Sequence, residues 1–126
     1  MTGAPRSIVV VDDDEDVRRL LVLSLSRVGG YDVRPVDSGQ ACLAELRRDR
    51  PDAVVLDVMM PVMDGPATLE EIRIDPDILD VPVVFLTAGI VDSDVERLRT
   101  LPVSGVLHKP FDPMRLPAQL AQLLGW

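Results

Sequence analysis

Five short apolar runs, each followed by a segment with helical spacing, constrain the fold of this chain most. The runs cover residues 7–11, 31–36, 53–56, 82–86 and 103–107. Continuous apolar runs bounded by polar turns are typical of strands that are buried on both faces, as in parallel sheets. Parallel neighbours need a long connection, usually a helix, and this chain offers one after each run. The sequence therefore predicts an α/β fold with five parallel strands.

The predicted helices cover residues 14–28, 38–48, 65–75, 92–101 and 112–124. Acidic residues 14–16 begin the first helix, where the helix dipole favours negative charge, and Gly29-Gly30 ends it. We interpret these acids as serving the helix end rather than a metal. Ser38 is the predicted N-cap of the second helix.

The last helix contains a conflict between its signals. Asp112 followed by Pro113 predicts an N-cap and a first helical residue. Pro117 would then lie inside the first turns and remove a backbone donor. We therefore expect the helix to start later than the cap indicates, or to be kinked.

The βα pattern is repeated five times in 126 residues, which is enough for one domain. Right-handed crossovers place helices on both faces of such a sheet. We predict the flavodoxin-like, doubly wound (βα)5 arrangement with strand order 2-1-3-4-5. Residues 1–6 are expected to form a flexible tail and residues 7–126 the domain.

Composition excludes several classes of protein. No apolar stretch approaches the length of a membrane span, and the amino end lacks a signal-peptide core, which predicts a cytoplasmic protein. The net charge of −8 argues against direct contact with nucleic acid. Cys42 is the one cysteine and lies on the apolar side of a predicted helix, so we expect a buried structural thiol.

Charged residues follow three of the predicted strands. Asp12 and Asp13 follow the first, Asp57 follows the third, and Lys109 follows the fifth. The carboxyl ends of parallel strands share one edge of the sheet, where open α/β sheets bind ligands. Crowded carboxylates repel one another unless a hard cation neutralises them, and Mg²⁺ suits Asp13, Asp57 and a backbone carbonyl. The sequence predicts a site for a cation and a phosphate.

These residues resemble the receiver domains of two-component response regulators, over nearly the whole chain. The similarity consists of short motifs at successive strand ends, namely Asp12-Asp13, Asp57, Met60-Pro61 with Asp64-Gly65, Thr87-Ala88 and Lys109-Pro110-Phe111. The resemblance implies the CheY-like form of the flavodoxin-like fold.

The resemblance also implies a role for each site residue. Asp57 would be the phosphoacceptor, with Thr87 donating a hydrogen bond to the phosphoryl oxygen and Lys109 offsetting its charge. Mg²⁺, with Mn²⁺ as the alternative, would be bound by the residues Asp12 (through water), Asp13, Asp57 and Met59 (through its backbone carbonyl).

Other residues near these motifs have simpler interpretations. We expect Asp64 and Gly65 to serve a turn. His108 alternates with Lys109 along a strand and should point away from it, so we assign it no chemical role. Met59, Met60 and Met63 are typical of packing and loop filling.

Two positions depart from the family pattern. Many receivers carry Tyr or Phe three residues before the lysine, whereas this chain has Val106, which has no ring to change rotamer. The connection at residues 101–105 contains Pro102, which stiffens the exit from the fourth helix. From Val106 we expect weaker or different signal transfer across the fourth helix, fifth strand and fifth helix, and from the Pro102 connection we expect a specialised partner surface.

The leading hypothesis is a stand-alone receiver that accepts a phosphoryl group from a histidine kinase or phosphotransfer protein and changes its affinity for a protein partner. It would be a monomer or a phosphorylation-dependent dimer, and a signalling domain rather than an enzyme. A phosphate sink or relay intermediate would use the same residues. The alternatives are a constitutive protein-interaction module with an unused acidic pocket, and a metal-dependent phosphohydrolase. The phosphohydrolase would need an acid or base where Met59 stands.

Overall fold

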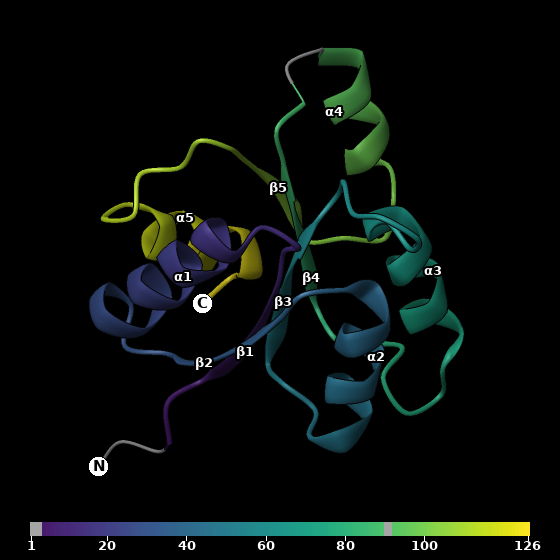
Figure 1. Ribbon diagram of the computed structural model, residues 1–126, viewed down its shortest axis with the longest axis horizontal. Helices are drawn as coiled ribbons and strands as arrows, with labels where there is room; N and C mark the ends of the chain where they lie inside the picture. Colours follow the sequence, from purple (N-terminus) through teal and green to yellow (C-terminus); the bar gives the residue numbers. More distant parts are fainter. Residues whose placement is uncertain (1–3, 90–91) are drawn as a thin grey trace.

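The computed structural model describes residues 4–89 and 92–126 and forms five βα units (Figure 1). The elements are β1 (Ser7–Val11), α1 (Glu15–Leu23), the π-helix η1 (Ser24–Val28), β2 (Asp32–Val36), α2 (Gly39–Arg48), β3 (Ala53–Asp57), α3 (Gly65–Ile74), β4 (Val83–Thr87), α4 (Asp92–Arg99), β5 (Gly105–His108) and α5 (Leu116–Leu124). Within this described part, no helix is both long and apolar enough to cross a membrane.

The strands form one parallel sheet in the order β2-β1-β3-β4-β5, which confirms the predicted topology. The register places Val11 beside Leu56 and Asp57 beside Leu86. Thr87 lies beside His108 at the next pair of strands. The carboxyl ends of β1, β3, β4 and β5 therefore meet at one edge, as the placement of the charged motifs required.

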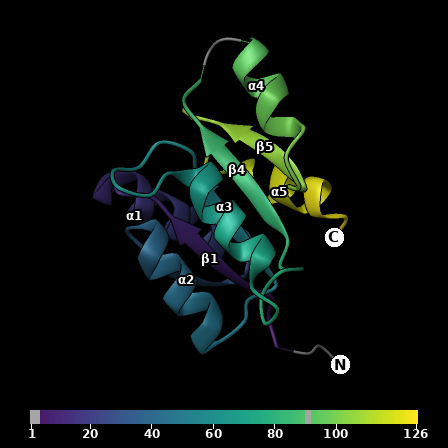
Figure 2. The ribbon, with the colours of Figure 1, turned by 90° about the vertical axis from the view of Figure 1, so that its right-hand side faces the viewer.

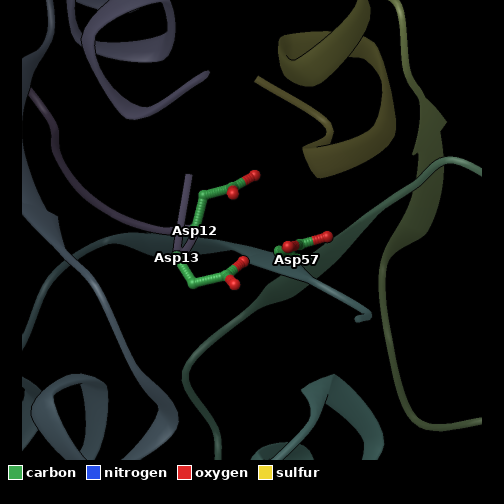
Figure 3. Close-up of side chains that lie close together, drawn as sticks. All are labelled: Asp12, Asp13 and Asp57. Carbon is green, nitrogen blue, oxygen red and sulfur yellow. The ribbon is translucent and has the colours of Figure 1, made fainter. Parts of the chain in front are cut away.

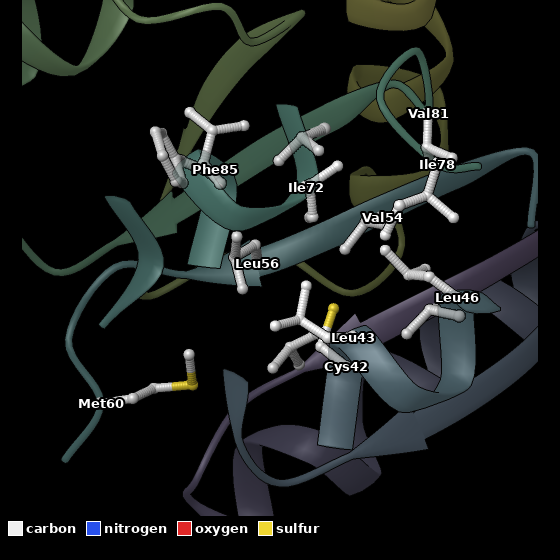
Figure 4. Packing of buried hydrophobic residues seen from close by; sticks show 14 of the residues in the cluster. Cys42, Leu43, Leu46, Val54, Leu56, Met60, Ile72, Ile78, Val81 and Phe85 are labelled. Atoms are coloured by element: carbon white, nitrogen blue, oxygen red, sulfur yellow. The ribbon is translucent and has the colours of Figure 1, made fainter. Parts of the chain in front are cut away.

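Apolar side chains form a layer on each face of the sheet. One layer packs α2, α3 and α4 against the sheet and contains Leu46, Leu56, Ile72 and Phe85 (Figure 4). The other packs α1 and α5 against the opposite face (Figures 1 and 2). Every residue of β3 and β4 is buried, which explains why these strands read as continuous apolar runs. Cys42 lies in the first layer, and burial raises the pKa of its thiol to about 12, as expected of a structural cysteine.

Short polar side chains begin three of the helices. The Asp14 carboxylate accepts the N–H groups of Asp16 and Val17, and the Ser38 hydroxyl accepts that of Ala41. Asp64 accepts the N–H of Ala67 at 2.9 Å and so caps α3. The predictions for the acidic start of the first helix and for Ser38 are confirmed, while Asp64 is a helix cap as well as a turn residue.

Three predicted boundaries, apart from the start of the last helix, differ from the structure by two residues or more. The first helix widens into the π-helix η1 from Ser24 onward instead of continuing as an α-helix to Val28. The fourth helix ends at Arg99 rather than Leu101. The fifth strand begins at Gly105 rather than Val103, whose N–H bonds back to Leu101.

The last helix begins at Leu116, so Asp112 is not its N-cap. Asp112 instead closes a separate turn, in which its carboxylate accepts the N–H of Met114 and its carbonyl accepts that of Leu116. The late start leaves Pro117 in the first turn, where its missing N–H costs no helical hydrogen bond. Of the two expectations for this helix, the later start is the one that the structure shows.

The described part of the expected tail is held at Arg6. The Arg6 carbonyl accepts the N–H of Asp32 at 2.9 Å, and its guanidinium lies 4.3 Å from the centre of the Trp126 ring. Residues 1–3 lie outside the described residues, so the division between tail and domain stays a prediction.

We expect Gly65→Ala to lower the free energy of unfolding by about 1–3 kcal/mol, because overpacking costs about that much. A Cβ atom at Gly65 would lie 2.6 Å from the carbonyl oxygen of Asp57 and 2.8 Å from the Cα of Val58. Both are backbone atoms and cannot rotate away. Urea denaturation followed by circular dichroism measures the change. The exposed Ala67→Ser in the same turn is the control, and equal stability of the two variants would contradict the crowding.

Candidate functional site

Three carboxylates gather at the carboxyl edge of the sheet (Figure 3). Asp12 and Asp13 follow β1 directly, and Asp57 is the last residue of β3, the neighbouring strand. One carboxylate oxygen from each residue lies within 4.8 Å of the others. Asp12 and Asp57 are buried, whereas Asp13 is exposed. The parallel register thus brings together residues that lie 44 positions apart or more in the sequence.

The two carboxylate oxygens of Asp12 differ in their hydrogen bonds. Its Oδ1 accepts the N–H of Asp14 at 2.9 Å, and its backbone carbonyl accepts a hydrogen bond from Arg18 at 2.9 Å. Its Oδ2 is buried without a hydrogen bond from any residue in 4–89 or 92–126. A carboxylate oxygen can accept from more than one group, so Oδ2, although Nζ of Lys109 lies 2.8 Å away, can also accept a hydrogen bond from water bound to a cation.

Lys109 supplies the positive charge of the site. Its Nζ lies 2.8 Å from Oδ2 of Asp12, as an ion pair without hydrogen-bond geometry, and 3.2 Å from Oδ1 of Asp57. Burial alone would lower the pKa of Lys109, but the two carboxylates outweigh burial and raise it. Lys109 is therefore a fixed ammonium that bridges two strand ends.

Two groups of opposing effects act on the pKa of the Asp57 carboxyl group. Burial and the nearby negative charge of Asp12 raise its pKa from 3.8 to about 6. Lys109 and the backbone N–H of Met59 act against this rise. The carboxylate form is thus weakly solvated and repelled, which favours a reaction or a ligand that relieves its charge.

Thr87 and Met59 flank this cluster. Thr87 is 3% exposed at the end of β4, and its hydroxyl oxygen accepts the N–H of Gly89 at 2.9 Å. Its carbonyl accepts the N–H of Lys109 at 2.8 Å, which ties the two loops together. The side chain of Met59 is 73% exposed and lines a hollow shared with Thr87.

The structure places the predicted site residues close to expectation. It brings together Asp12, Asp13, Asp57 and Lys109, and it sets Thr87 at the end of the adjacent strand. The roles of these residues, and the use of the Met59 carbonyl as a ligand, stay predictions. His108 is exposed and lines a different hollow together with Phe111 and Gln119, in agreement with its predicted direction. Met60 is buried and Met63 packs against the core, as expected of packing residues.

Sequence reasoning missed Arg18, which anchors the backbone of Asp12. Its position six residues after Asp12 puts it on the first turns of α1, from which its guanidinium reaches back to the strand end. The amphipathic pattern alone assigns such an arginine to solvent, so no signal in the sequence marks this contact.

The arrangement can hold a hard cation and place a carboxylate nucleophile beside a fixed ammonium. The three carboxylates supply the oxygen ligands that Mg²⁺ prefers, and Oδ2 of Asp12 can also accept a hydrogen bond from water bound to the cation. Burial of Asp57 also keeps its charge poorly solvated, and so more reactive, until an electrophile arrives.

Comparisons with known proteins agree with this chemistry. Residues 8–121 match the family described as the response regulator receiver domain. The chain is 43% identical to the response regulator MprA of Mycolicibacterium vanbaalenii over 95% of its own length and 51% of the relative's. It is 38% identical to a probable transcriptional regulator ycf27 of Porphyridium aerugineum, over 93% of this chain and 47% of that protein. The chain thus spans about half the length of these curated relatives.

Solved structures show the same fold over nearly the whole chain. A putative response regulator from Chloroflexus aurantiacus superposes with a TM-score of 0.87 at 32% identity, covering 97% of this chain and 99% of that one. The chemotaxis protein CheY4 of Vibrio cholerae superposes with a TM-score of 0.86 at 28% identity, covering 95% and 99% of the two chains.

We expect Asp57→Asn to stabilise the fold in the presence of chelator. Because the folded protein holds the Asp57 proton more tightly than the unfolded chain does, ionised Asp57 costs stability at high pH. Urea unfolding at about pH 8 should show a gain of about 1–2 kcal/mol, which shrinks as the pH falls through about 6 towards 4, where wild-type Asp57 is protonated. Asp13→Asn removes an exposed carboxylate of the same cluster and should change stability less. Equal stability of Asp57→Asn and wild type at pH 8 would show that ionised Asp57 does not destabilise the fold.

Proposed function

This chain belongs to the response regulator receiver domain family, and from that premise we propose that Asp57 accepts a phosphoryl group from a histidine kinase or a phosphotransfer protein. One observation carries the proposal. The buried carboxylate of Asp57 ends the central strand β3, with Lys109 Nζ 3.2 Å from one of its oxygens and two further carboxylates in reach of a shared cation.

The reaction is a displacement at phosphorus. An oxygen of the Asp57 carboxylate forms the new O–P bond while the P–N bond to the donor histidine breaks, and the departing imidazole nitrogen takes the electron pair and then a proton from solvent. Lys109 offsets negative charge on the transferring group. Thr87 donates its hydroxyl hydrogen to a phosphoryl oxygen.

Mg²⁺ is the proposed cofactor, and Mn²⁺ fits the same oxygen ligands. Asp13 and Asp57 would bind it directly, Asp12 through water, and Met59 through its carbonyl. When bound, the cation supplies neutralisation of charge on the phosphoryl oxygens.

The phosphoryl group would then change the surface of the domain. It adds charge and acceptor oxygens beside Lys109, whose present partners are Asp12 and Asp57. When Lys109 and Thr87 move toward the new group, the loops that follow β4 and β5 move with them. This movement shifts the equilibrium between two conformations of the surface. The result is altered binding of a protein partner, in the monomer or in a phosphorylation-dependent dimer.

We propose that the domain assists its own phosphorylation and dephosphorylation without turning over an external substrate, and that this acidic domain does not itself contact nucleic acid. A cytoplasmic location stays a prediction. A phosphate sink or relay step would use the same chemistry and differ only in the partner.

Intact-mass spectrometry after incubation with acetyl phosphate tests the proposal. We expect a single phosphoryl adduct in the presence of Mg²⁺, because acetyl phosphate offers an activated phosphoryl group to the Asp57 nucleophile. The adduct should be absent from Asp57→Ala and absent after addition of chelator. An unmodified wild-type protein would instead favour a constitutive interaction module, and continuous release of phosphate by Asp57→Ala would favour a phosphohydrolase.

We expect Met59→Asn to shorten the lifetime of the phosphorylated protein several-fold. The bulky apolar side chain of Met59 lines the hollow beside Thr87, and a smaller polar residue would admit and orient water near the phosphoryl group. Phosphate release after removal of the donor measures the rate. Met59→Leu keeps an apolar side chain of similar size and should release phosphate as wild type does. An unchanged rate in Met59→Asn would show that this side chain does not limit the access of water.

A further inference from the structure

Val106 leaves the link between the site and α4 without an aromatic ring. Its side chain is 7% exposed and packs in the apolar layer that also contains Val95 and Leu98 of α4. A valine buried between β5 and α4 has no long side chain that could swing into or out of the sheet edge. Some other group on this face has to respond if phosphorylation changes α4.

A hollow of about 360 Å³ joins α4 to the site. Its walls come from the residues after Asp57, from the residues after β4 and from the last turns of α4, and they include Met59, Thr87, Gly89 and Arg97. Arg97 is the one charged residue among these lining residues, all of which lie in the described part of the chain. Figures 1 and 2 both show α4 beside the carboxyl edge of the sheet, near the end of β4.

The connection that follows α4 is anchored by Arg73 of α3. Arg73 of α3 donates from Nε and Nη2 to the carbonyl of Pro102, at 3.1 and 2.9 Å. The same guanidinium donates from Nη1 to the carbonyls of Leu79 and Val81 at 2.9 and 2.8 Å. The connection after α4 is thus tied to α3 and to the loop before β4.

We infer that Arg97 binds the phosphoryl group on Asp57 and thereby couples phosphorylation to α4, an inference that rests on the proposed function. A phosphoryl group carries a charge near −2 and three strong acceptor oxygens, and a guanidinium matches such a group with two parallel N–H donors. Arg97 would approach this group from the hollow that Thr87 also lines, while Lys109 contacts both Asp12 and Asp57. Attraction between Arg97 and the phosphoryl group draws α4 toward the sheet edge. Arg97 thereby links the site to α4, which Val106 cannot do because it has no ring.

Binding of beryllofluoride in the presence of Mg²⁺ tests this inference, because beryllofluoride becomes tetrahedral when a carboxylate oxygen binds it and then mimics a phosphoryl group. We expect Arg97→Ala to weaken its binding about tenfold in calorimetric titration, a modest loss for paired hydrogen bonds between charged groups because Arg97 is exposed to solvent. Arg97→Lys keeps the charge but loses the paired donors, and should fall between Arg97→Ala and wild type. Amide hydrogen exchange should show protection of α4 by beryllofluoride in wild type and loss of that protection in Arg97→Ala.

Arg99→Ala is the matched control. Arg99 lies in the same last turn of α4, carries the same charge and pairs with the exposed Glu96, so its removal should leave both measurements unchanged. Equal effects of Arg97→Ala and Arg99→Ala, or wild-type affinity and protection in Arg97→Ala, would overturn the inference. Asp57→Asn distinguishes failure of the Arg97 inference from failure of the proposed function, because this variant should not bind beryllofluoride at all. If Asp57→Asn still binds, the proposed function itself fails.

Discussion

Repulsion between two buried carboxylates on neighbouring strands is the constraint on which the rest of this site depends. Asp12 and Asp57 are almost fully buried, and each would be more stable apart from the other. Lys109 compensates for only part of their charge, since the pKa of Asp57 stays raised despite the ammonium 3.2 Å away. The fold thus maintains an uncompensated negative site, and binding of a cation or gain of an electrophilic group relieves it.

The parallel sheet makes this arrangement rigid. Apolar layers on both faces bury β3 and β4 completely, so the strand ends cannot separate to relieve the repulsion without loss of core packing. The loops beyond those ends are joined by backbone hydrogen bonds, such as that from Lys109 to Thr87. A new charge at Asp57 therefore acts most readily on the loops and on α4, because the sheet itself does not yield.

Much of this architecture could be predicted from the sequence, for physical reasons that also explain the failures. A buried strand is visible as an apolar run, and a helix start is visible as a capping residue such as Ser38. Both can be predicted because they depend on residues within the segment itself. The start of α5 does not follow from the sequence alone, because Asp112 and Pro117 give competing signals that only the folded chain resolves. Arg18 and Arg73 act through carbonyls elsewhere in the fold, and a sequence pattern shows only that such residues are charged.

The contacts of Trp126 make its intrinsic fluorescence a probe of folding. Its ring centre lies 5.4 Å from that of Tyr31 and 4.3 Å from the Arg6 guanidinium, and it is the one tryptophan of the chain. Tyr31 and Arg6 lie just before β2 and β1, at the amino edge of the sheet, opposite the carboxylates. Emission from this indole consequently follows the integrity of the tertiary structure while staying insensitive to events at the acidic edge, so a variant that fails to react can be told apart from one that fails to fold.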